Sequence, residues 1–432
     1  MRTLFQPPIL PVHPRAYLES AALLHLVRAH LNKATVDPVS LTGLAELNWE
    51  NILTLAQQHG VTALLYNGLV QVCPESAPSQ ILKQLHAQVQ ANAVMNLFLT
   101  EELCRLLDFL ASHGILAIPF KGPILAAIAY GNLAMRKSGD LDILVAERDF
   151  CRTRDLMIAH GYDPAIQPWF LNEAQEHAYH ASRNECLLLR QDKRVAIDLH
   201  RKLAAGDFFL LPLDLDRVWN VDHLWPRLQS VSLAGKSIPT LTPEDCLLFL
   251  CVHGSKHLWL RLIWICDIAA LLHSYPQLNW DWMIQQAQVI GCQRMLWVGV
   301  QLAHELLDAP LPERVSQTIQ SDATVRWLTA RVTGWLFRPH GSLAKGFSWQ
   351  RIIFHCQELE LLQDKVQYCY RSAGHYGLAP LRRAITPTFR DRHFLQLPSW
   401  LSFLYYLVRP VRLIRDFGQR ARHSLYQRLN IQ

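Results

Sequence analysis

The sequence lacks two features that would place the chain in a specialised class. Its ten cysteines include no C-x-x-C pair, and several lie inside apolar helical patterns. Buried free thiols in a reducing cytoplasm are therefore the simplest interpretation. No window holds the roughly 18–20 uncharged apolar residues that a membrane span requires. The richest window, 246–272, is interrupted by two histidines, a lysine, an arginine and an aspartate.

The sequence is also low in charged residues, and it shows neither a short-period repeat nor a recognisable signal peptide. Charged residues make up 18% of the chain and hydrophobic residues 50%, which argues against wholesale disorder. The first fifteen residues are rich in proline and lack the apolar core of a signal peptide. We find no short-period repeat. The 432 residues suffice for two or three domains, and the net charge of +6 is compatible with phosphate-bearing ligands.

Apolar spacing predicts a mainly helical protein that contains one α/β segment. Residues 16–113 have helical periodicity, and Gly114 ends the last of these helices. The period then changes, and strands are expected at 115–120, 141–146, 178–190 and 194–200. Helices are expected within this segment at 122–130 and 148–160. Thr242-Pro243 is a capped helix start, and helices are expected after it at 244–258, 260–274, 281–290 and 292–307.

These changes of pattern divide the chain into five expected parts. They are an extended tail (1–15), an N-terminal helical region (16–113), an α/β core (114–240), a C-terminal helical domain (241–395) and a basic amphipathic segment (396–432). The predicted fold class is α+β, with a small mixed sheet embedded in a mainly helical protein.

Three aspartates lie at the ends of predicted strands. Asp140 and Asp142 stand at the entrance of one strand, where residues i and i+2 share a face, and Asp198 lies near the end of another. If these strands are neighbours, the three acids converge, and a divalent cation such as Mg²⁺ would relieve their repulsion. Three acids are the minimum for two-metal phosphoryl transfer. The structural alternative is a loop residue, a solvated edge and an ion pair between Asp198 and Arg201.

A lysine and a glycine occupy the turn between the first predicted strand and its helix. Gly122 would let the backbone approach a phosphate, the helix N-terminus offers free N–H groups, and Lys121 adds a positive charge. Pro123 removes one of these N–H donors. The alternative is an ordinary turn glycine.

A second group of polar residues lies at 253–267. His253, Lys256 and His257 share one helix face, and Arg261 and Asp267 follow. A zinc protease motif would require glutamate at position 254, which is glycine. We favour cations that face the acidic cleft and bind triphosphate or acceptor, with Asp267 orienting Arg261 or His257. The alternatives are a zinc-binding histidine pair and a solvated helix surface.

The C-terminal segment combines apolar and basic residues. Residues 398–408 are apolar and aromatic, and five arginines follow by residue 422. This pattern is typical of a basic helix on an anionic membrane, of an RNA-contacting arm, or of a helix packed on its own domain.

Taken together, these motifs resemble a known family. The order K-G, R-x-x-G-D-L-D, D-L-H and H-x-x-K-H-x-x-x-R-L-x-W-x-x-D, over residues 49–418, resembles the bacterial uncharacterised nucleotidyltransferases of the DNA-polymerase-β-like superfamily. In this pattern Arg136 and Gly139 precede the paired aspartates, and His200 follows Asp198. The superfamily's usual Gly-Ser or Gly-Gly turn is replaced here by Gly122-Pro123.

The resemblance implies a polymerase-β-like core and a metal-dependent nucleotidyltransferase. Such an enzyme moves an NMP from an NTP to a hydroxyl or amine acceptor and releases pyrophosphate, with two Mg²⁺ or Mn²⁺ ions held by Asp140, Asp142 and Asp198. Expected nucleotide-binding residues are Lys121, Gly122, Arg136, Gly139, His253, Lys256, His257 and Arg261, supported by His200 and Asp267.

The acceptor and the setting of the reaction stay open. The acceptor could be a small molecule, a protein side chain or an RNA end. The expected location is cytoplasmic, with a peripheral position at the inner membrane surface, through 398–422, as an alternative. A catalytically inactive nucleotide-binding scaffold is the other functional alternative, and Pro123 is the feature that favours it.

Overall fold

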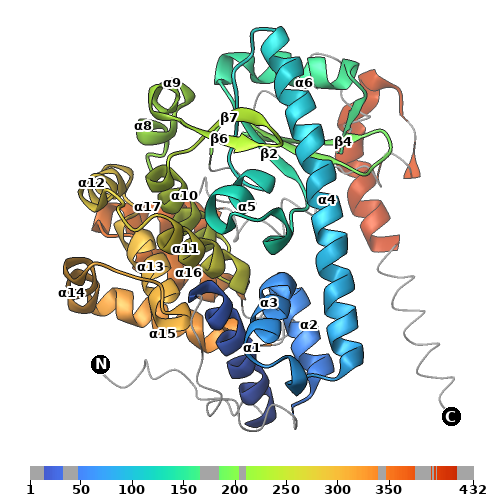
Figure 1. Cartoon of the computed structure of the whole chain (residues 1–432). Coiled ribbons are helices and arrows are strands. Elements are labelled where there is room, and N and C mark those ends of the chain that lie inside the picture. The colour runs from blue at the N-terminus through green and yellow to red at the C-terminus, as the bar shows by residue number, and fades with distance from the viewer. Residues whose placement is uncertain are drawn as a thin grey trace, which may run out of the picture.

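The computed structural model describes most of the chain (Figure 1). The described residues are 14–32, 47–165, 184–203, 211–338, 347–374, 391, 394–395 and 397–415. The predicted tail before residue 14, strand residues 178–183 and the arginines at 420 and 422 lie outside these ranges.

A five-stranded mixed sheet forms the α/β core. Its strands lie in the order β1-β2-β5-β4-β3. The pair β2–β5 is parallel and the other pairs are antiparallel. The strand bounds are β1 Ala117–Pro119, β2 Leu141–Val145, β3 Tyr162–Pro164, β4 Glu185–Arg190 and β5 Ala196–His200. The sequence therefore predicts β1, β2, β4 and β5 in place, and misses the short edge strand β3.

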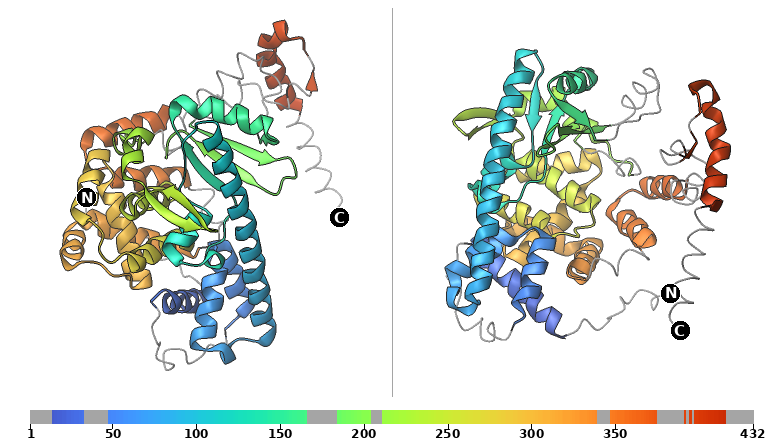
Figure 2. Two further views of the ribbon diagram at one scale, coloured as in Figure 1. Left: turned by 45° about the horizontal axis from the view of Figure 1, so that its top comes forward. Right: turned by 90° about the vertical axis from the view of Figure 1, so that its right-hand side faces the viewer.

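The two faces of this sheet pack against different helices. Helix α4 (Ser79–Ser112) runs along one face and continues to the N-terminal helices, as Figures 1 and 2 show. Alternate residues of β2 and β5, such as Ile143 and Leu199, join a buried cluster with α4 and α6 (Phe150–Ala159). The opposite face, which carries Phe120 and Leu144, joins the larger apolar core that includes Phe249 of α10 (Pro243–Lys256).

Helices surround this core at both ends of the chain. The N-terminal helices are α1 (Pro14–Asn32), α2 (Trp49–His59) and α3 (Thr62–Val72). Helix α1 begins at Pro14 rather than at Ala16, because proline is tolerated in a first helical turn. After β2 and β5, two short helices, α8 (Asp216–Trp219) and α9 (Val221–Leu224), precede the hairpin β6 (Gln229–Leu233) and β7 (Lys236–Thr240).

The C-terminal helices begin at the predicted cap. Thr242 accepts a hydrogen bond from the backbone N–H of Asp245, and Pro243 occupies the first position of α10. The following helices are α11 (Leu262–Ser274), α12 (Trp280–Ile290), α13 (Gln293–Leu307), α14 (Glu313–Ser321), α15 (Ala323–Leu336), α16 (Phe347–Glu358) and α17 (Leu362–Ser372). A last helix spans 405–415. Within the described part of the chain, no helix has both the length and the apolar character needed to cross a bilayer.

Candidate active site

Parallel pairing of β2 and β5 brings two of the predicted acids together. Asp142 lies opposite Asp198 in this register, and Leu144 lies opposite His200. Side chains that face each other across paired strands point to the same side of the sheet. Both acids and His200 therefore share one face. Because Arg201 pairs with Glu147 rather than Asp198, the structural alternative considered for Asp198 is wrong.

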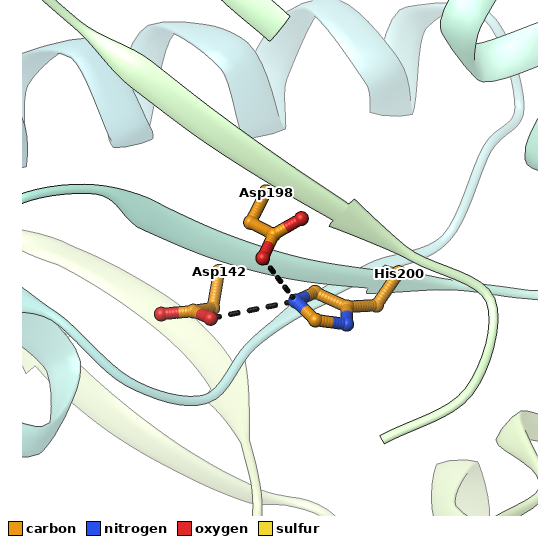
Figure 3. A group of neighbouring side chains, drawn as sticks. All are labelled: Asp142, Asp198 and His200. Carbon is orange, nitrogen blue, oxygen red and sulfur yellow. Dashed lines mark ion pairs between the residues drawn. The ribbon is translucent and has the colours of Figure 1, made fainter. Parts of the chain in front are cut away.

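Asp142, Asp198 and His200 form a compact group (Figure 3). His200 Nε2 lies 3.4 Å from an oxygen of Asp142 and 3.3 Å from an oxygen of Asp198. One ligand atom from each of the three residues lies within 4.8 Å of the others. Asp142 and His200 are buried, at 3% and 5% exposure, whereas Asp198 is half-buried. Only Asp198 is therefore open to an incoming group.

The charges in this group perturb each other strongly. Burial alone would raise the pKa of Asp142, but Lys121 and His200 outweigh it and hold that pKa well below its usual range. Burial alone would lower the pKa of His200, but the carboxylates of Asp142 and Asp198 raise it to about 9. The group without a metal therefore carries a protonated imidazole between two carboxylates.

The donor set fits a divalent cation. Asp142 Oδ1 and His200 Nε2 are buried and make ion-pair contacts without hydrogen-bond geometry, and His200 Nδ1 has no hydrogen-bond partner among the described residues. Buried polar atoms are nearly always hydrogen-bonded, so this incompletely bonded group fits an external ligand. Two carboxylates and an imidazole suit Mn²⁺ as well as Mg²⁺, since imidazole is a ligand for transition metals. His200, expected only as a supporting residue, therefore joins the candidate ligands.

Lys121 lies at the edge of this group. Its Nζ is 2.5 Å from Asp142 Oδ1, an ion pair without hydrogen-bond geometry. The ammonium also lies over the rings of Phe120 and Phe249, 5.5 and 5.9 Å from their centroids. Such cation–π contacts stabilise an ammonium group that is largely withdrawn from water. Phe249, on α10, was not among the predicted site residues, because its spacing is that of any core position.

Asp140 lies outside the compact group. It precedes β2 and is more accessible than Asp142. Desolvation and the nearby charge of Asp142 raise its pKa, while Lys121 opposes this shift. Asp140 is thus within electrostatic range of the site, and its role as a metal ligand stays a prediction. Gly139, beside it, is exposed, and its Cβ position would meet no neighbouring atom.

Gly122 adopts a conformation that requires glycine. Its φ is 60° and its ψ is −134°, and a Cβ there would lie 3.0 Å from the carbonyl oxygen of Asp140. Glycine thus allows the turn before α5 (Pro123–Tyr130) to pack directly against the loop that carries Asp140. The Lys121-Gly122 turn and the loop that carries Asp140 are therefore in direct contact.

Arg136 and Asp267 form a buried ion pair that corrects one prediction. Arg136 Nε donates to both carboxylate oxygens of Asp267, at 2.9 and 3.1 Å, and Tyr130 donates its hydroxyl to the same carboxylate at 2.9 Å. Asp267 is 0% exposed. It therefore orients Arg136, not Arg261 or His257 as expected. Sequence reasoning missed this contact because the partners are 131 positions apart.

The loop that holds Arg136 is also fixed from α4. The buried side chain of Asn96 donates to the carbonyl oxygens of Leu133 and Arg136, and Asn92 donates to that of Ala134. These amides satisfy backbone acceptors that a loop cannot pair internally. Helix α4, before the α/β core, and helix α11, after it, thus both hold the loop that leads to Asp140 and Asp142.

The histidines at 253 and 257 are not the cations that were expected. Burial and the nearby Lys121 lower the pKa of His253 well below its usual range, and burial and Lys256 lower that of His257 to about 3. Both rings are therefore neutral near pH 7. Their rings lie 4.7 Å apart, and His257 stacks on Trp264 at 4.9 Å. Uncharged imidazoles can donate and accept hydrogen bonds, so a role in nucleotide binding stays a prediction.

The other predicted cations of this region lie at helix ends. Lys256 is the last residue of α10 and is half-buried. Arg261 is the exposed cap of α11 and donates to the backbone carbonyl of Gln58. The five residues from 253 to 267 are thus divided between two helices, as their spacing suggested.

The C-terminal arginines that the structure describes are largely engaged. Arg409 and Arg412 are buried and both pair with Asp391, at 2.8 and 2.6 Å. Arg415 lies over the ring of Phe394. Arg409 and Arg412 therefore serve the internal packing of this segment, which favours the alternative of a packed C-terminal helix for these two residues.

The mixed sheet and its buried carboxylate–imidazole group define a protein with a candidate phosphoryl-transfer site. A family model described as "Uncharacterised nucleotidyltransferase" matches residues 45–308. The chain therefore belongs to this family of nucleotidyltransferases, which confirms the predicted resemblance. The match includes the whole α/β core and the helices up to α13, and the C-terminal segment lies beyond it. No curated protein and no solved structure matches the chain.

Proposed function

We propose that this protein transfers a nucleoside monophosphate from an NTP to a hydroxyl or amine acceptor. The observation that carries the proposal is the register of β2 and β5, which sets Asp142, Asp198 and His200 on one face beside Lys121. Family membership supports nucleotidyl transfer in general. In the reaction, the acceptor oxygen or nitrogen bonds to the α-phosphorus, the bond to the β-phosphate oxygen breaks, and pyrophosphate leaves.

The residues of the group divide these tasks according to their exposure. Asp142, Asp198 and His200 would hold Mg²⁺ or Mn²⁺, with Asp140 as a further ligand, and the bound ions supply charge stabilisation for the triphosphate. Lys121 adds a cation next to Asp142. Asp198, the accessible member, is positioned to take the proton from the acceptor.

Label transfer tests this proposal. The full chain is incubated with each α-³²P-labelled NTP, Mg²⁺ or Mn²⁺, and cell extract. We expect a labelled product and released pyrophosphate, both reduced at least 100-fold by Asp198→Asn, because this change removes a charged ligand and the base. Asp155→Asn, the same change on α6 at the opposite face of the sheet, where Asp155 pairs with Arg154, is the matched control and should retain activity. If no NTP gives label or pyrophosphate, the scaffold alternative is supported instead.

A peripheral membrane contact is a second candidate role, favoured by one observation. Leu407, Val411 and Ile414 are all more than 60% exposed and follow one stripe of the C-terminal helix, and Phe403, equally exposed, lies in the 3-10 turn before it. An unpaired apolar stripe on a surface helix is typical of an interfacial helix. Flotation with anionic liposomes should carry the wild type upward and leave Leu407→Asp behind. Leu97→Asp, on α4 and similarly exposed, is the control, and equal flotation of all three proteins would refute the role.

A further inference from the structure

One buried hydroxyl beside the active site has no function in the fold. Ser138 is 4% exposed, and its Oγ finds no hydrogen-bond partner among the described residues. A buried serine hydroxyl is normally hydrogen-bonded, because leaving it unpaired costs free energy. Ser138 lies two residues before Asp140, in the loop that Arg136 and Asn96 hold in place. Its position is therefore fixed without its own hydroxyl contributing a bond.

The hydroxyl faces the start of α5. Ser138 Oγ lies 4.0 Å from the Cβ position of Gly122, the residue that caps this helix. The first intrahelical bond of α5 runs from the N–H of Ala126 to the carbonyl of Gly122. The N–H groups of Ile124 and Leu125 therefore precede the helical ladder, and Gly122 offers no side chain to cap them. Among the described residues, Ser138 supplies the one side-chain atom within 4 Å of the Gly122 Cβ position.

The surrounding charges favour an anion at this point. The N-terminus of a helix carries a partial positive charge and directs its N–H groups outward. Lys121 immediately precedes the turn, whereas the guanidinium of Arg136 is already paired with Asp267. Across Lys121 lie the carboxylates of Asp142 and Asp198, which suit a cation and not an anion. Phosphate oxygens beyond the reacting phosphorus would therefore lie on the α5 side of Lys121.

We propose that Ser138 Oγ is a further binding group for the pyrophosphate portion of the NTP, beside the α5 N-terminus that the sequence already predicts as a phosphate site. The hydroxyl donates a hydrogen bond to a terminal phosphate oxygen, next to the N–H groups of Ile124 and Leu125. This inference rests on the proposed nucleotidyl transfer and adds a binding residue from a different loop than the Lys121-Gly122 turn. Pro123 then ceases to be an obstacle, because the missing donor is replaced from the neighbouring segment.

Binding of inorganic pyrophosphate tests the subsite. Calorimetry with the full chain, Mg²⁺ and pyrophosphate compares the wild type with Ser138→Ala. We expect 10- to 100-fold weaker binding, which is the value of one hydrogen bond to a charged group. Ser138→Cys keeps the volume and offers a weak donor, so its affinity should be intermediate. Ser372→Ala is the matched control, because Ser372 is also buried with an unpaired hydroxyl, and it should bind like the wild type.

The outcomes separate this inference from the proposed function. Removal of an unpaired hydroxyl is nearly neutral for folding, so Ser138→Ala should melt at the wild-type temperature. Wild-type affinity in Ser138→Ala, or equal losses in Ser138→Ala and Ser372→Ala, would overturn the subsite. If the wild type still transfers labelled nucleotide in that case, the proposed function stands. If the wild type binds neither pyrophosphate nor any NTP, both fail.

Discussion

Replacement of Asp267 by asparagine should break the buried ion pair with Arg136 and lower the free energy of unfolding. The carboxylate of Asp267 is fully buried and bonds to Arg136 and Tyr130. Asparagine keeps the shape and one acceptor oxygen but removes the negative charge. The guanidinium of Arg136, whose side chain is 12% exposed, would then lack its counter-charge in a poorly solvated position.

The magnitude follows from the burial of the pair. Breaking a buried ion pair by removing one partner costs about 3–5 kcal/mol, because the other charge stays buried and uncompensated. Asparagine retains one hydrogen bond, so we expect a loss of about 3 kcal/mol in the free energy of unfolding. Replacing both partners, as Arg136→Met with Asp267→Leu, should restore most of this stability, because similarly sized apolar residues remove both charges.

Urea denaturation followed by circular dichroism, combined with NTP binding, measures both effects. Tyr130→Phe is the control, because it removes one hydrogen bond to the same carboxylate and should cost only about 1 kcal/mol. The double variant should be stable, and weaker NTP binding by this variant would support the predicted nucleotide-binding role of Arg136. The reasoning is refuted if the free energy of unfolding of Asp267→Asn lies within about 1 kcal/mol of the wild-type value. It is also refuted if the double variant is no more stable than Asp267→Asn alone.

Two further predictions concern the glycine turn and the neutral histidines. Gly122→Ala should reduce label transfer at least tenfold, because its Cβ would press on the carbonyl of Asp140. Gly131→Ala, whose Cβ would meet no neighbouring atom, is the control and should retain activity. Equal rates of label transfer in the two variants would contradict this prediction. The folded pKa values of His253 and His257 lie below the unfolded value of 6.5, so the unfolded chain takes up more protons as the pH falls. These two histidines should therefore each lower the free energy of unfolding by about 1 kcal/mol between pH 6.5 and 5.5, partly offset by His200 with its raised pKa. His257→Phe should remove about 1 kcal/mol of the drop, and a pH profile identical to that of the wild type would count against this.

Local signals in the sequence were sufficient for much of the fold. The strands β2 and β5 follow from short apolar alternation, and the start of α10 follows from the Thr242-Pro243 cap. Both depend on neighbours within a few residues. The edge strand β3 and the hairpin partner β7 were missed, because three to five residues with mixed burial have no distinctive period.

The candidate site shows the same division. The sequence by itself determined which residues are present at the strand ends, and so predicted the acids and the glycine turn. Only the tertiary structure decided that β2 and β5 are parallel and in register, which sets His200 among the acids. It also decided that Asp267 holds Arg136, and that His253 is neutral. Each of these depends on long-range packing and on burial, which changes charge and pairing in ways that residue spacing does not record.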